Sequence, residues 1–349
     1  MWFNNTMMVK SDSDKDPQKK ILIVKLSSLG DVLHTLPIIF DIKSYIPSAE
    51  IDWLVEEAYV DLLKPLESNA SREYIHQIIP FGLRRWKKNI FSRANWVELV
   101  QLIRQLRTNH YDLIIDFQGL IKSALIAALA RSNSEVIGLK NSTDFSSYEP
   151  LARQFYSQTV AIPKQCHAIE VARYLINHAL GIQSKGTKPD FYPVFEKRDL
   201  PDMFIEFKPY ALCFHATARH EKRWSTQAWV EIGKYLVERG ITPIYPWGNT
   251  EEQAISETIA RQIPRAVVPE IFSLRDYFEI IQQAKLTIGV DTGLTHLSAA
   301  LQCPTIELYC DSPIWKTCGY WSDSIINLGD LGAPPNATLV KNAINQLTQ

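Results

Sequence analysis

Short, continuous runs of β-branched and other apolar residues alternate with helical periodicity along most of this 349-residue chain. The run at 21–24 is apolar throughout, which is typical of a strand buried on both faces of a parallel sheet. Further elements are expected as strands at 51–55 and 113–116 and as helices at 97–106 and 123–130, the first helix with Leu99, Leu102, Ile103 and Leu106 on one face. Strands that alternate with helices predict βαβ units and a parallel sheet.

A second series of the same kind begins near Tyr210. Ser225 is expected to cap a helix that runs to Glu238 and is closed by Gly240. The segment from Ser273 to Asp276 has the pattern of a capping box that opens another helix. The remaining elements are expected as strands at 211–214, 242–246, 266–268, 286–290 and 305–309, and as helices at 251–262, 294–301 and 339–347, the last with Leu339, Ala343, Ile344 and Leu347 on one side.

The two series predict an α/β protein of two domains with a cleft between them. Five segments are expected: a disordered leader at 1–20, an N-terminal domain at 21–185, a proline-rich and charged linker at 186–209, a C-terminal domain at 210–325, and a final helical segment at 326–349 that packs back on the body. Ligands of open parallel sheets bind beyond the carboxyl ends of the strands. The loops that follow strands are therefore where candidate site residues are sought.

Composition excludes several classes of protein. Lys and Arg number 37 and Asp and Glu 38, so the net charge is −1, which argues against nucleic acid as the main partner. The five cysteines include no C-x-x-C pair, so they predict neither a disulfide framework nor a zinc site. The histidines also lack a ligand spacing, and no metal site is predicted. Nothing in the sequence specifies an oligomeric state.

No stretch of the chain approaches the roughly 18 consecutive apolar residues of a membrane span. The segment 1–20 has no apolar run that could serve as a signal peptide. We therefore expect a cytoplasmic protein, which a surface patch could still bring to a membrane.

The loop from Ser27 to Asp31 follows the first strand and opens a helix. Small residues such as Ser28 and Gly30 let backbone N–H groups face a ligand, and a helix N-terminus favours an anion. Asp31 could serve chemistry here, or it could simply cap the helix. The pattern alone leaves both roles open, and G-x-G-x-x-G is absent.

The segment 289–296 takes a buried strand directly into Asp291-Thr292-Gly293 and then into a helix. Free backbone donors and a partial positive charge at such a helix start suit a phosphate or pyrophosphate. His296 lies one turn further along and could donate a hydrogen bond. The alternative is a structural corner with a capping aspartate.

Two basic segments complete the candidates. The segment 215–224 follows a strand and carries Thr217 and Lys222, which could neutralise a diphosphate. The segment 83–93 has five basic residues and no acidic one, interleaved with Trp86 and Phe91, and could bind phosphates, nucleic acid or an anionic membrane face. Each could equally be a solvated charged surface.

These motifs together, in this order, resemble the lipopolysaccharide heptosyltransferases of glycosyltransferase family 9. The resemblance covers the chain from Ile21 to about Tyr320, and the run from Lys25 to His34 favours the type I branch over type II. The motifs that carry it are Val24–Pro37, Arg84–Lys88, Asp116–Ala124, His215–Trp224, Pro246–Gly248 and Val290–Leu297.

The resemblance implies a GT-B fold, two Rossmann-like domains whose parallel sheets face a central cleft. It implies inverting transfer of L-glycero-D-manno-heptose from ADP-heptose to the inner Kdo of Kdo2-lipid A, at the cytoplasmic face of the inner membrane and with no cofactor. Asp31 would be the general base. The donor would be bound by Thr217, Lys222, Glu252, Asp291, Thr292, Gly293 and His296, and the acceptor by Ser28, Gly30, Arg84, Arg85, Lys87, Lys88 and Lys122.

Two positions depart from the family pattern. Ala218 stands where a second threonine is frequent, which removes one hydroxyl from the expected phosphate site. Tyr148 stands before Glu149-Pro150-Leu151 where a basic residue is common, which bears on acceptor contacts. Three alternative functions remain at this point: another heptosyltransferase of the family, a nucleotide-sugar epimerase of the same fold, and a non-enzymatic protein that binds lipid A.

Overall fold

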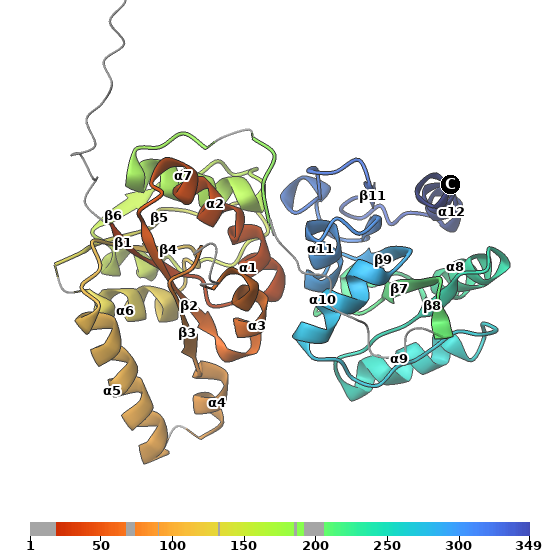
Figure 1. Cartoon of the computed structure of the whole chain (residues 1–349), viewed down its shortest axis with the longest axis horizontal. Coiled ribbons are helices and arrows are strands. Elements are labelled where there is room, and N and C mark those ends of the chain that lie inside the picture. Colours follow the sequence, from red (N-terminus) through yellow and green to blue (C-terminus); the bar gives the residue numbers. More distant parts are fainter. Residues whose placement is uncertain (1–18, 68–73, 90, 132, 185–186, 192–205) are drawn as a thin grey trace, which may run out of the picture.

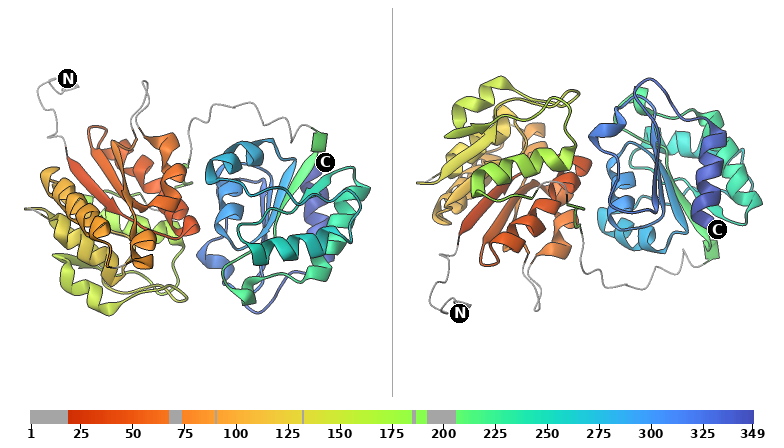
Figure 2. Two further views of the ribbon diagram at one scale, coloured as in Figure 1. Left: turned by 90° about the horizontal axis from the view of Figure 1, so that it is seen from below. Right: turned by 90° about the horizontal axis from the view of Figure 1, so that it is seen from above.

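The computed structural model describes residues 19–67, 74–89, 91–131, 133–184, 187–191 and 206–349. They form two α/β domains that lie side by side, each with a parallel sheet between layers of helices (Figures 1 and 2). The expected leader and most of the expected linker lie outside the described residues, although Lys20 already belongs to the first strand.

The N-terminal domain is built on a six-stranded parallel sheet in the order β3-β2-β1-β4-β5-β6. The strands are β1 (Lys20–Val24), β2 (Glu50–Glu56), β3 (Gln77–Phe81), β4 (Leu113–Asp116), β5 (Glu135–Leu139) and β6 (Gln158–Val160). The direction of strand addition reverses between β1 and β4, both of which pair in parallel with their neighbours. Such a reversal opens a crevice at the carboxyl ends of the two strands, and this crevice is where Ser27 to Asp31 lie.

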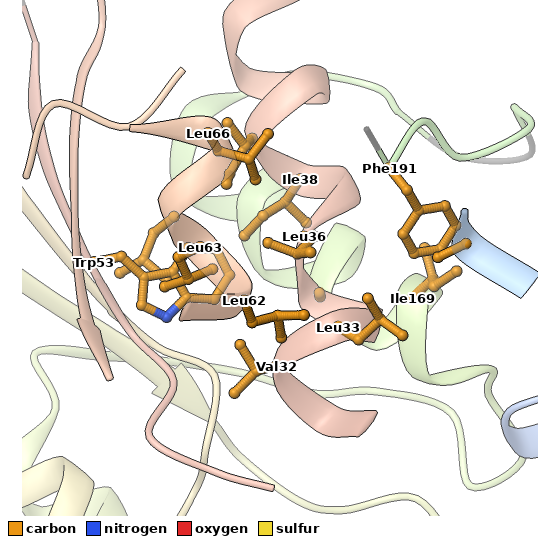
Figure 3. Packing of buried hydrophobic residues seen from close by; sticks show 14 of the residues in the cluster. Val32, Leu33, Leu36, Ile38, Trp53, Leu62, Leu63, Leu66, Ile169 and Phe191 are labelled. Carbon is orange, nitrogen blue, oxygen red and sulfur yellow. The ribbon is translucent and has the colours of Figure 1, made fainter. Parts of the chain in front are cut away.

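Helices cover both faces of this sheet because β1 is apolar on both sides. Ile21 and Ile23 pack in one buried cluster, while Leu22 and Val24 pack in another. Figure 3 shows part of the first cluster, with Val32, Leu33 and Leu36 between Trp53 on one side and Ile169 and Phe191 on the other. The helices are α1 (Leu29–Thr35), α2 (Pro37–Tyr45), α3 (Val60–Leu63), α4 (Leu83–Lys88), α5 (Arg93–Thr108), α6 (Ile121–Ala130) and α7 (Ala168–Leu180).

The C-terminal domain is built on a five-stranded parallel sheet in the order β11-β10-β9-β7-β8. Its strands are β7 (Tyr210–Phe214), β8 (Thr242–Ile244), β9 (Leu286–Val290), β10 (Thr305–Tyr309) and β11 (Ile325–Gly329). Its helices are α8 (Thr226–Glu238), α9 (Thr250–Ala260), α10 (Leu274–Gln283), α11 (Gly293–Ala300) and α12 (Ala337–Thr348). The two parallel α/β domains confirm the fold class expected from the sequence.

The helix signals of the second domain are confirmed. The Ser225 side chain accepts a hydrogen bond from the backbone N–H of Ala228, as an N-cap does. Gly240 follows the helix with φ of +73°, a left-handed conformation that glycine adopts without strain. At the start of α10 the Asp276 carboxylate accepts bonds from both the backbone N–H (2.8 Å) and the hydroxyl (2.7 Å) of Ser273.

Some local expectations are wrong. The strand expected at 266–268 is a single bridge between Ile244 and Val267, because Pro269 has no N–H to continue the ladder. In α12 the side chain of Leu339 is 47% exposed and Val340 is buried instead. The boundary expected at 325 falls inside β11, which pairs with β10 in the second sheet.

An apolar cluster joins the two domains behind the cleft. Residues of β1, α1 and α7 share it with residues of β7, α10 and α11. The rings of Phe191 and Trp321 lie 4.5 Å apart at this junction. No helix in the described part of the chain has the length and apolar character needed to cross a membrane.

The close approach of α11 to its own sheet depends on Gly289 in β9. A Cβ at this position would lie 2.1 Å from the Oγ1 of Thr295 and 3.0 Å from the Cβ of Phe214. The Thr295 hydroxyl is held there because it donates to the carbonyl of Val290 at 2.8 Å. Glycine therefore sets how near the first turn of α11 lies to the strand end.

We expect Gly289→Ala to lower the free energy of unfolding by about 1–3 kcal/mol, the usual cost of overpacking. The measurement is guanidinium denaturation followed by circular dichroism. Thr295→Ala serves as the control and as the second mutation of a cycle. The double variant should lose less stability than the two single losses combined, and strict additivity would contradict the proposed clash.

Candidate active site

A cleft of about 1170 Å³ lies between the two domains. Its walls come from the loops after β1 and β4 on one side and from the loops after β7, β9 and β10 on the other. Of the residues expected to form a site, those that line it are Ser28, Gly30, Asp31, Arg84, Thr217, Lys222, Glu252, Asp291, Thr292, Gly293 and His296. The structure therefore brings together residues that are far apart in the sequence.

Asp31 lies in the first turn of α1 and faces the cleft. Its Oδ2 accepts hydrogen bonds from the backbone N–H (2.9 Å) and the hydroxyl (2.8 Å) of Ser28. These bonds make Asp31 part of a capping box, so the structural alternative raised by the sequence is realised. Its Oδ1 has no hydrogen-bond partner in the described part of the chain, and one oxygen therefore stays available to a ligand.

The electrostatic surroundings keep Asp31 ionised. Burial alone would raise the pKa of its carboxyl group, but the Lys25 ammonium and the bonds from Ser28 outweigh burial and lower it. Lys25 is itself fixed, because its Nζ donates to the carbonyl of Phe117 at 3.0 Å. The loop before Asp31 is held by Gln118, whose Oε1 accepts from the backbone of Leu26 and Ser27 at 3.2 Å each.

The N-terminus of α11 faces the same part of the cleft. Thr292 caps this helix without a hydrogen bond from its side chain, so the first N–H groups of the helix point to the cleft. A Cβ on Gly30 would lie 3.6 Å from the Cα of Gly293, and a Cβ on Gly293 would lie 2.7–2.8 Å from the side chain of Leu29. Glycine at 293 thus allows the starts of α1 and α11 to meet across the domain boundary, whereas a Cβ on Gly30 would make only ordinary contacts there.

A buried chain of charges supports this helix start. Glu307 accepts a hydrogen bond from Nδ1 of His296 at 2.9 Å, and Nε2 of His296 donates to Asp291 at 2.9 Å. The other Asp291 oxygen pairs with the Nζ of Lys222. Glu307 also accepts bonds from the Tyr309 hydroxyl (2.8 Å) and the backbone N–H of Gly319 (2.9 Å). This series of charged side chains runs from the middle of β10 to the cleft and fixes the position of the Lys222 ammonium.

The two carboxylates hold His296 in its charged form. Burial alone would lower the pKa of His296, but the charge of Glu307 and the hydrogen bonds to Asp291 and Glu307 raise it to about 10. Burial likewise opposes ionisation of Asp291, yet the bonds and charges of His296 and Lys222 hold its pKa far below the usual range. His296, expected beside a ligand, therefore acts mainly on Asp291.

Two charged residues of the site, Lys316 and Glu307, were not predicted from the sequence. Lys316 follows β10 and lines the cleft, and its Nζ donates to the carbonyl of Phe145 in the other domain. Burial lowers its pKa, and the nearby Asp31 and Asp291 charges partly oppose that effect. The sequence contains a signal for each residue. Lys316 lies after a strand of the second series, and Glu307 is a charged residue inside an apolar strand.

The cleft floor in the C-terminal domain combines hydroxyl and aromatic groups. The Thr217 hydroxyl contacts the Asp291 carbonyl at 3.4 Å. Ala218 also lines the cleft, so the missing hydroxyl leaves a methyl group at the wall. Beyond them lie Glu252, which accepts a bond from the Gly248 N–H at 2.8 Å, and Trp247, whose Nε1 donates to the Pro269 carbonyl at 2.8 Å.

The basic segment 84–88 is divided by the structure. Arg84 lines the cleft and donates to the Tyr59 hydroxyl at 2.9 Å. Arg85 forms ion pairs with Glu57 and Glu98, each at 2.8 Å. Neither Arg85 nor Lys87, Lys88 and Lys122 is among the residues that line the cleft. Only one of these five expected acceptor contacts therefore faces the cavity directly.

The segment 316–318 ties the domains together beside the cleft. The carbonyl of Thr317 faces Nε2 of His34 at 3.3 Å, and the carbonyl of Cys318 accepts from Nε2 of His167 at 3.1 Å. Burial lowers the pKa of His34 to about 4 and of His167 to about 3. Both rings are therefore neutral near pH 7.

Tyr148, which stands where a basic residue is common in the family, donates a hydrogen bond to the Lys140 carbonyl at 2.8 Å. Its hydroxyl is therefore bound within the protein.

No group of three or more histidine, cysteine, aspartate or glutamate side chains in the described ranges is arranged to hold a metal ion. The potential ligands for an anion are instead backbone N–H groups and lysine side chains. This arrangement can bind a phosphorylated compound and present a carboxylate to it.

The family model of glycosyltransferase family 9 (heptosyltransferase) matches residues 99–347. Lipopolysaccharide heptosyltransferase 1 of Escherichia coli O18:K1:H7 is 34% identical over 95% of this chain and 97% of the relative. The enzyme of that name from Salmonella typhimurium is 37% identical over 83% of this chain and 88% of its own length.

Solved structures agree with these sequence matches. The E. coli heptosyltransferase WaaC with ADP superposes with a TM-score of 0.78 at 32% identity, covering 94% of this chain and 99% of that one. The same enzyme with ADP-2-deoxy-2-fluoro heptose gives a TM-score of 0.72 at 32% identity, covering 94% of this chain and 98% of that one.

The buried charge chain generates a pH prediction. Because folding raises the pKa of His296 from 6.5 to about 10, the resulting stabilisation is present below about pH 6.5 and is lost as the pH rises through 10. In Glu307→Gln we expect the His296 pKa to fall by roughly 1–3, as when an opposite charge is removed. The stabilisation in Glu307→Gln should still decline from about pH 6.5 upward, but it should be smaller and should be exhausted at a lower pH than in the wild type.

Ring-nitrogen NMR titration of His296, with denaturation at pH 7 and pH 9, measures both effects. Glu257→Gln is the control, because Glu257 pairs with Arg261 on the surface of α9 at 2.9 Å. An unchanged His296 titration in Glu307→Gln would show that Glu307 does not hold the imidazolium.

Proposed function

The chain belongs to glycosyltransferase family 9, and from this premise we propose that it is a heptosyltransferase I of lipopolysaccharide inner-core synthesis. Its donor is ADP-heptose, its acceptor the inner Kdo of Kdo2-lipid A, and the reaction inverts the anomeric centre. Identity to enzymes named heptosyltransferase 1 over most of the chain supports the donor and the pathway. Membership of this family also favours transfer over epimerisation or simple lipid A binding.

One observation carries the proposal of a mechanism. The Asp31 turn of the acceptor half meets the α11 start of the donor half, with Gly30 against Gly293. A nucleotide diphosphate on α11 therefore places its sugar close to a carboxylate with one free oxygen. Transfer requires a base beside the reacting hydroxyl and a stabiliser for the leaving group, and both groups occur at this junction.

The leaving group is handled by the C-terminal domain. We assign the diphosphate to the backbone N–H groups of Thr292 and Gly293, with the Lys222 ammonium beside them and the Thr217 hydroxyl at the wall. As the glycosidic bond to ADP breaks, negative charge grows on the terminal phosphate. Donors that are already oriented stabilise that charge without reorganising. Asp291 and His296 contribute indirectly, because they hold Lys222 in place.

The base is Asp31. Its lowered pKa keeps it anionic at neutral pH, so Oδ1 can accept the proton of the Kdo hydroxyl as that oxygen attacks the anomeric carbon from the face opposite to ADP. The inversion follows from this single displacement. The proton then passes from Asp31 to solvent, and the Ser28 bonds restore the carboxylate for the next turnover.

The nucleoside and the acceptor occupy opposite ends of the cleft in this proposal. The ribose of ADP lies by Glu252, and its adenine ring lies against the apolar wall near Trp247 and Ile271. The acceptor contacts Ser28, Gly30 and Arg84. We also assign Lys122 to the acceptor, although it does not line the cleft; its charge and that of Arg84 both lower the pKa of Glu56, which burial raises.

The acceptor also sets the proposed location. A lipid-linked sugar is presented at the surface of a bilayer, so we place the enzyme peripherally at the cytoplasmic face of the inner membrane. Lys87 and Lys88 lie outside the cleft in the described structure, and their proposed contacts are with phosphates beyond its rim rather than with the reacting sugar.

The first test is ADP release from ADP-heptose, with and without Kdo2-lipid A. We expect release only with acceptor, and we expect Asp31→Asn to slow it by at least roughly a hundredfold, the usual contribution of a general base. ADP binding by calorimetry should be unchanged in that variant. Near-normal turnover in Asp31→Asn would refute the base assignment, and donor turnover without acceptor would favour the epimerase alternative.

A second test addresses the diphosphate site. Lys222→Met should weaken ADP binding by roughly ten- to a hundredfold, because one charged hydrogen bond to the phosphates is lost. Lys234→Met, at an exposed position of α8, is the matched control. Circular dichroism establishes that each variant is folded. Unchanged calorimetric affinity in a folded Lys222→Met protein would remove Lys222 from the site.

A further inference from the structure

The helices α4 and α5 form a hairpin that stands out from the N-terminal domain, at the lower edge of Figure 1. Its first residues adjoin the cleft, where Arg84 is part of the wall. Phe91 lies in the turn at the far end. A helix rises 1.5 Å per residue, so the six residues of α4 carry the chain about 9 Å outward from the cleft.

The hairpin is braced internally. Glu98 of α5 accepts hydrogen bonds from Arg85 and from the Nε1 of Trp86, both at 2.8 Å. Asn95 donates to the carbonyl of Asn89 across the turn at 2.8 Å. The tip is therefore presented in a fixed orientation, and Arg85 has a structural partner instead of a ligand.

A second apolar surface, on α5 and on the turn before it, stays largely exposed. Leu102 and Leu106 pack inward with the sheet. On the other side Phe91 is 90% exposed, Trp96 59%, Val97 47% and Val100 44%. These four residues gather at the tip and along the first half of α5. We refer to them as the tip patch.

Charge around the tip patch is of one sign. Residues 83–108 contain seven basic residues and one acidic residue, in a chain whose net charge is −1. The single acid, Glu98, is already paired with Arg85. The exposed basic side chains near the tip patch are Lys87, Lys88 and Arg93, with Arg104 one turn beyond Val100; Arg107 lies at the other end of α5, where its Nε donates to the Leu129 carbonyl.

We propose that the α4–α5 hairpin is the membrane-docking element of the enzyme and that its partner is an anionic lipid bilayer. Phe91 and Trp96 insert at the level of the headgroups, and the surrounding basic residues contact lipid phosphates. An apolar face with aromatic residues and a basic rim is the composition of interfacial helices. A second copy fits poorly, because its own hairpin carries the same charge.

This inference rests on the proposed function in one respect, since a lipid-linked acceptor gives the docking a purpose. A bilayer seated on the tip patch lies next to the Arg84 end of the cleft. A headgroup sugar then reaches Asp31 along α4 while its acyl chains stay in the bilayer.

The test uses the full chain and vesicles that contain no acceptor. Cosedimentation with phosphatidylcholine vesicles, with and without phosphatidylglycerol, should show binding that requires the anionic lipid and weakens with salt. Arg93→Gln/Arg104→Gln should weaken it roughly thirtyfold, at about a fivefold loss per charge. Lys234→Gln/Lys285→Gln, exposed lysines of the other domain, is the matched control and should bind normally.

The apolar contribution is tested separately. Phe91→Ser/Trp96→Ser should reduce vesicle binding at least tenfold, whereas the control Leu151→Ser/Leu339→Ser, which changes residues that are 58% and 47% exposed, should not. Equal binding by the hairpin variants and their controls would overturn the proposal. Sedimentation that changes from dimer to monomer in Phe91→Ser/Trp96→Ser, without vesicle binding by the wild type, would instead assign the tip patch to a second copy.

Failure of this inference is distinguishable from failure of the proposed function. Phe91→Ser/Trp96→Ser should release ADP at the wild-type rate when the acceptor is dissolved in detergent. If the wild-type protein turns over but does not bind vesicles, the docking proposal alone is overturned. Vesicle binding without any turnover would leave the docking element in place and overturn the assigned reaction.

Discussion

The meeting of two helix starts across the domain boundary is the constraint on which the site depends. Gly293 lets α1 and α11 approach closely, because any side chain at this position would collide with Leu29. Each helix presents the positive end of its dipole and free N–H groups. Lys25, Lys222 and Lys316 add charge to the same region. The carboxylates of Asp31 and Asp291 offset part of this positive potential, and the proposed diphosphate would offset more of it.

The apolar cluster behind the cleft and the polar tether beside it determine how the halves are held. Core residues of both domains are buried together, and Phe191 packs on Trp321. Within the segment 316–318, the Cys318 carbonyl accepts a hydrogen bond from His167 and the Lys316 ammonium donates to the carbonyl of Phe145. Asp31 and the N-terminus of α11 therefore keep their relative position through contacts within the protein itself.

Sequence patterns predicted the parts of the molecule in which one local signal decides the outcome. The strands 113–116, 286–290 and 305–309 have the expected bounds because each is an apolar run flanked by polar residues. The same patterns predicted that Asp31 and Asp291 each lie beyond the carboxyl ends of the strands in their own sheet. The sequence left open whether Asp31 caps a helix or serves chemistry, and the capping box shows that one oxygen does the first while the other remains available.

Other features depended on contacts between distant residues, which no local pattern reports. In the sequence Arg85 cannot be told from the other residues of its basic segment, but in the structure it forms ion pairs with Glu57 and Glu98. His296 looked like a ligand to phosphate, but Glu307, in the middle of another strand, turns it into a cation that orients Asp291. The face of α5 that carries Leu102 was read correctly, while the exposed residues opposite it gave no periodic signal of their own.

The near-zero net charge hides a strong internal separation of charge. Residues 83–108 carry +6, so the other residues together carry −7 against a total of −1. Such a molecule behaves at long range as a dipole and not as an ion. Near a negatively charged surface the molecule experiences a torque. This torque turns the α4–α5 hairpin toward the surface before contact, while the rest of the protein, which carries the negative charge, is repelled. On the proposed docking, orientation would thus be selected during diffusion, before the hairpin makes any contact with lipid.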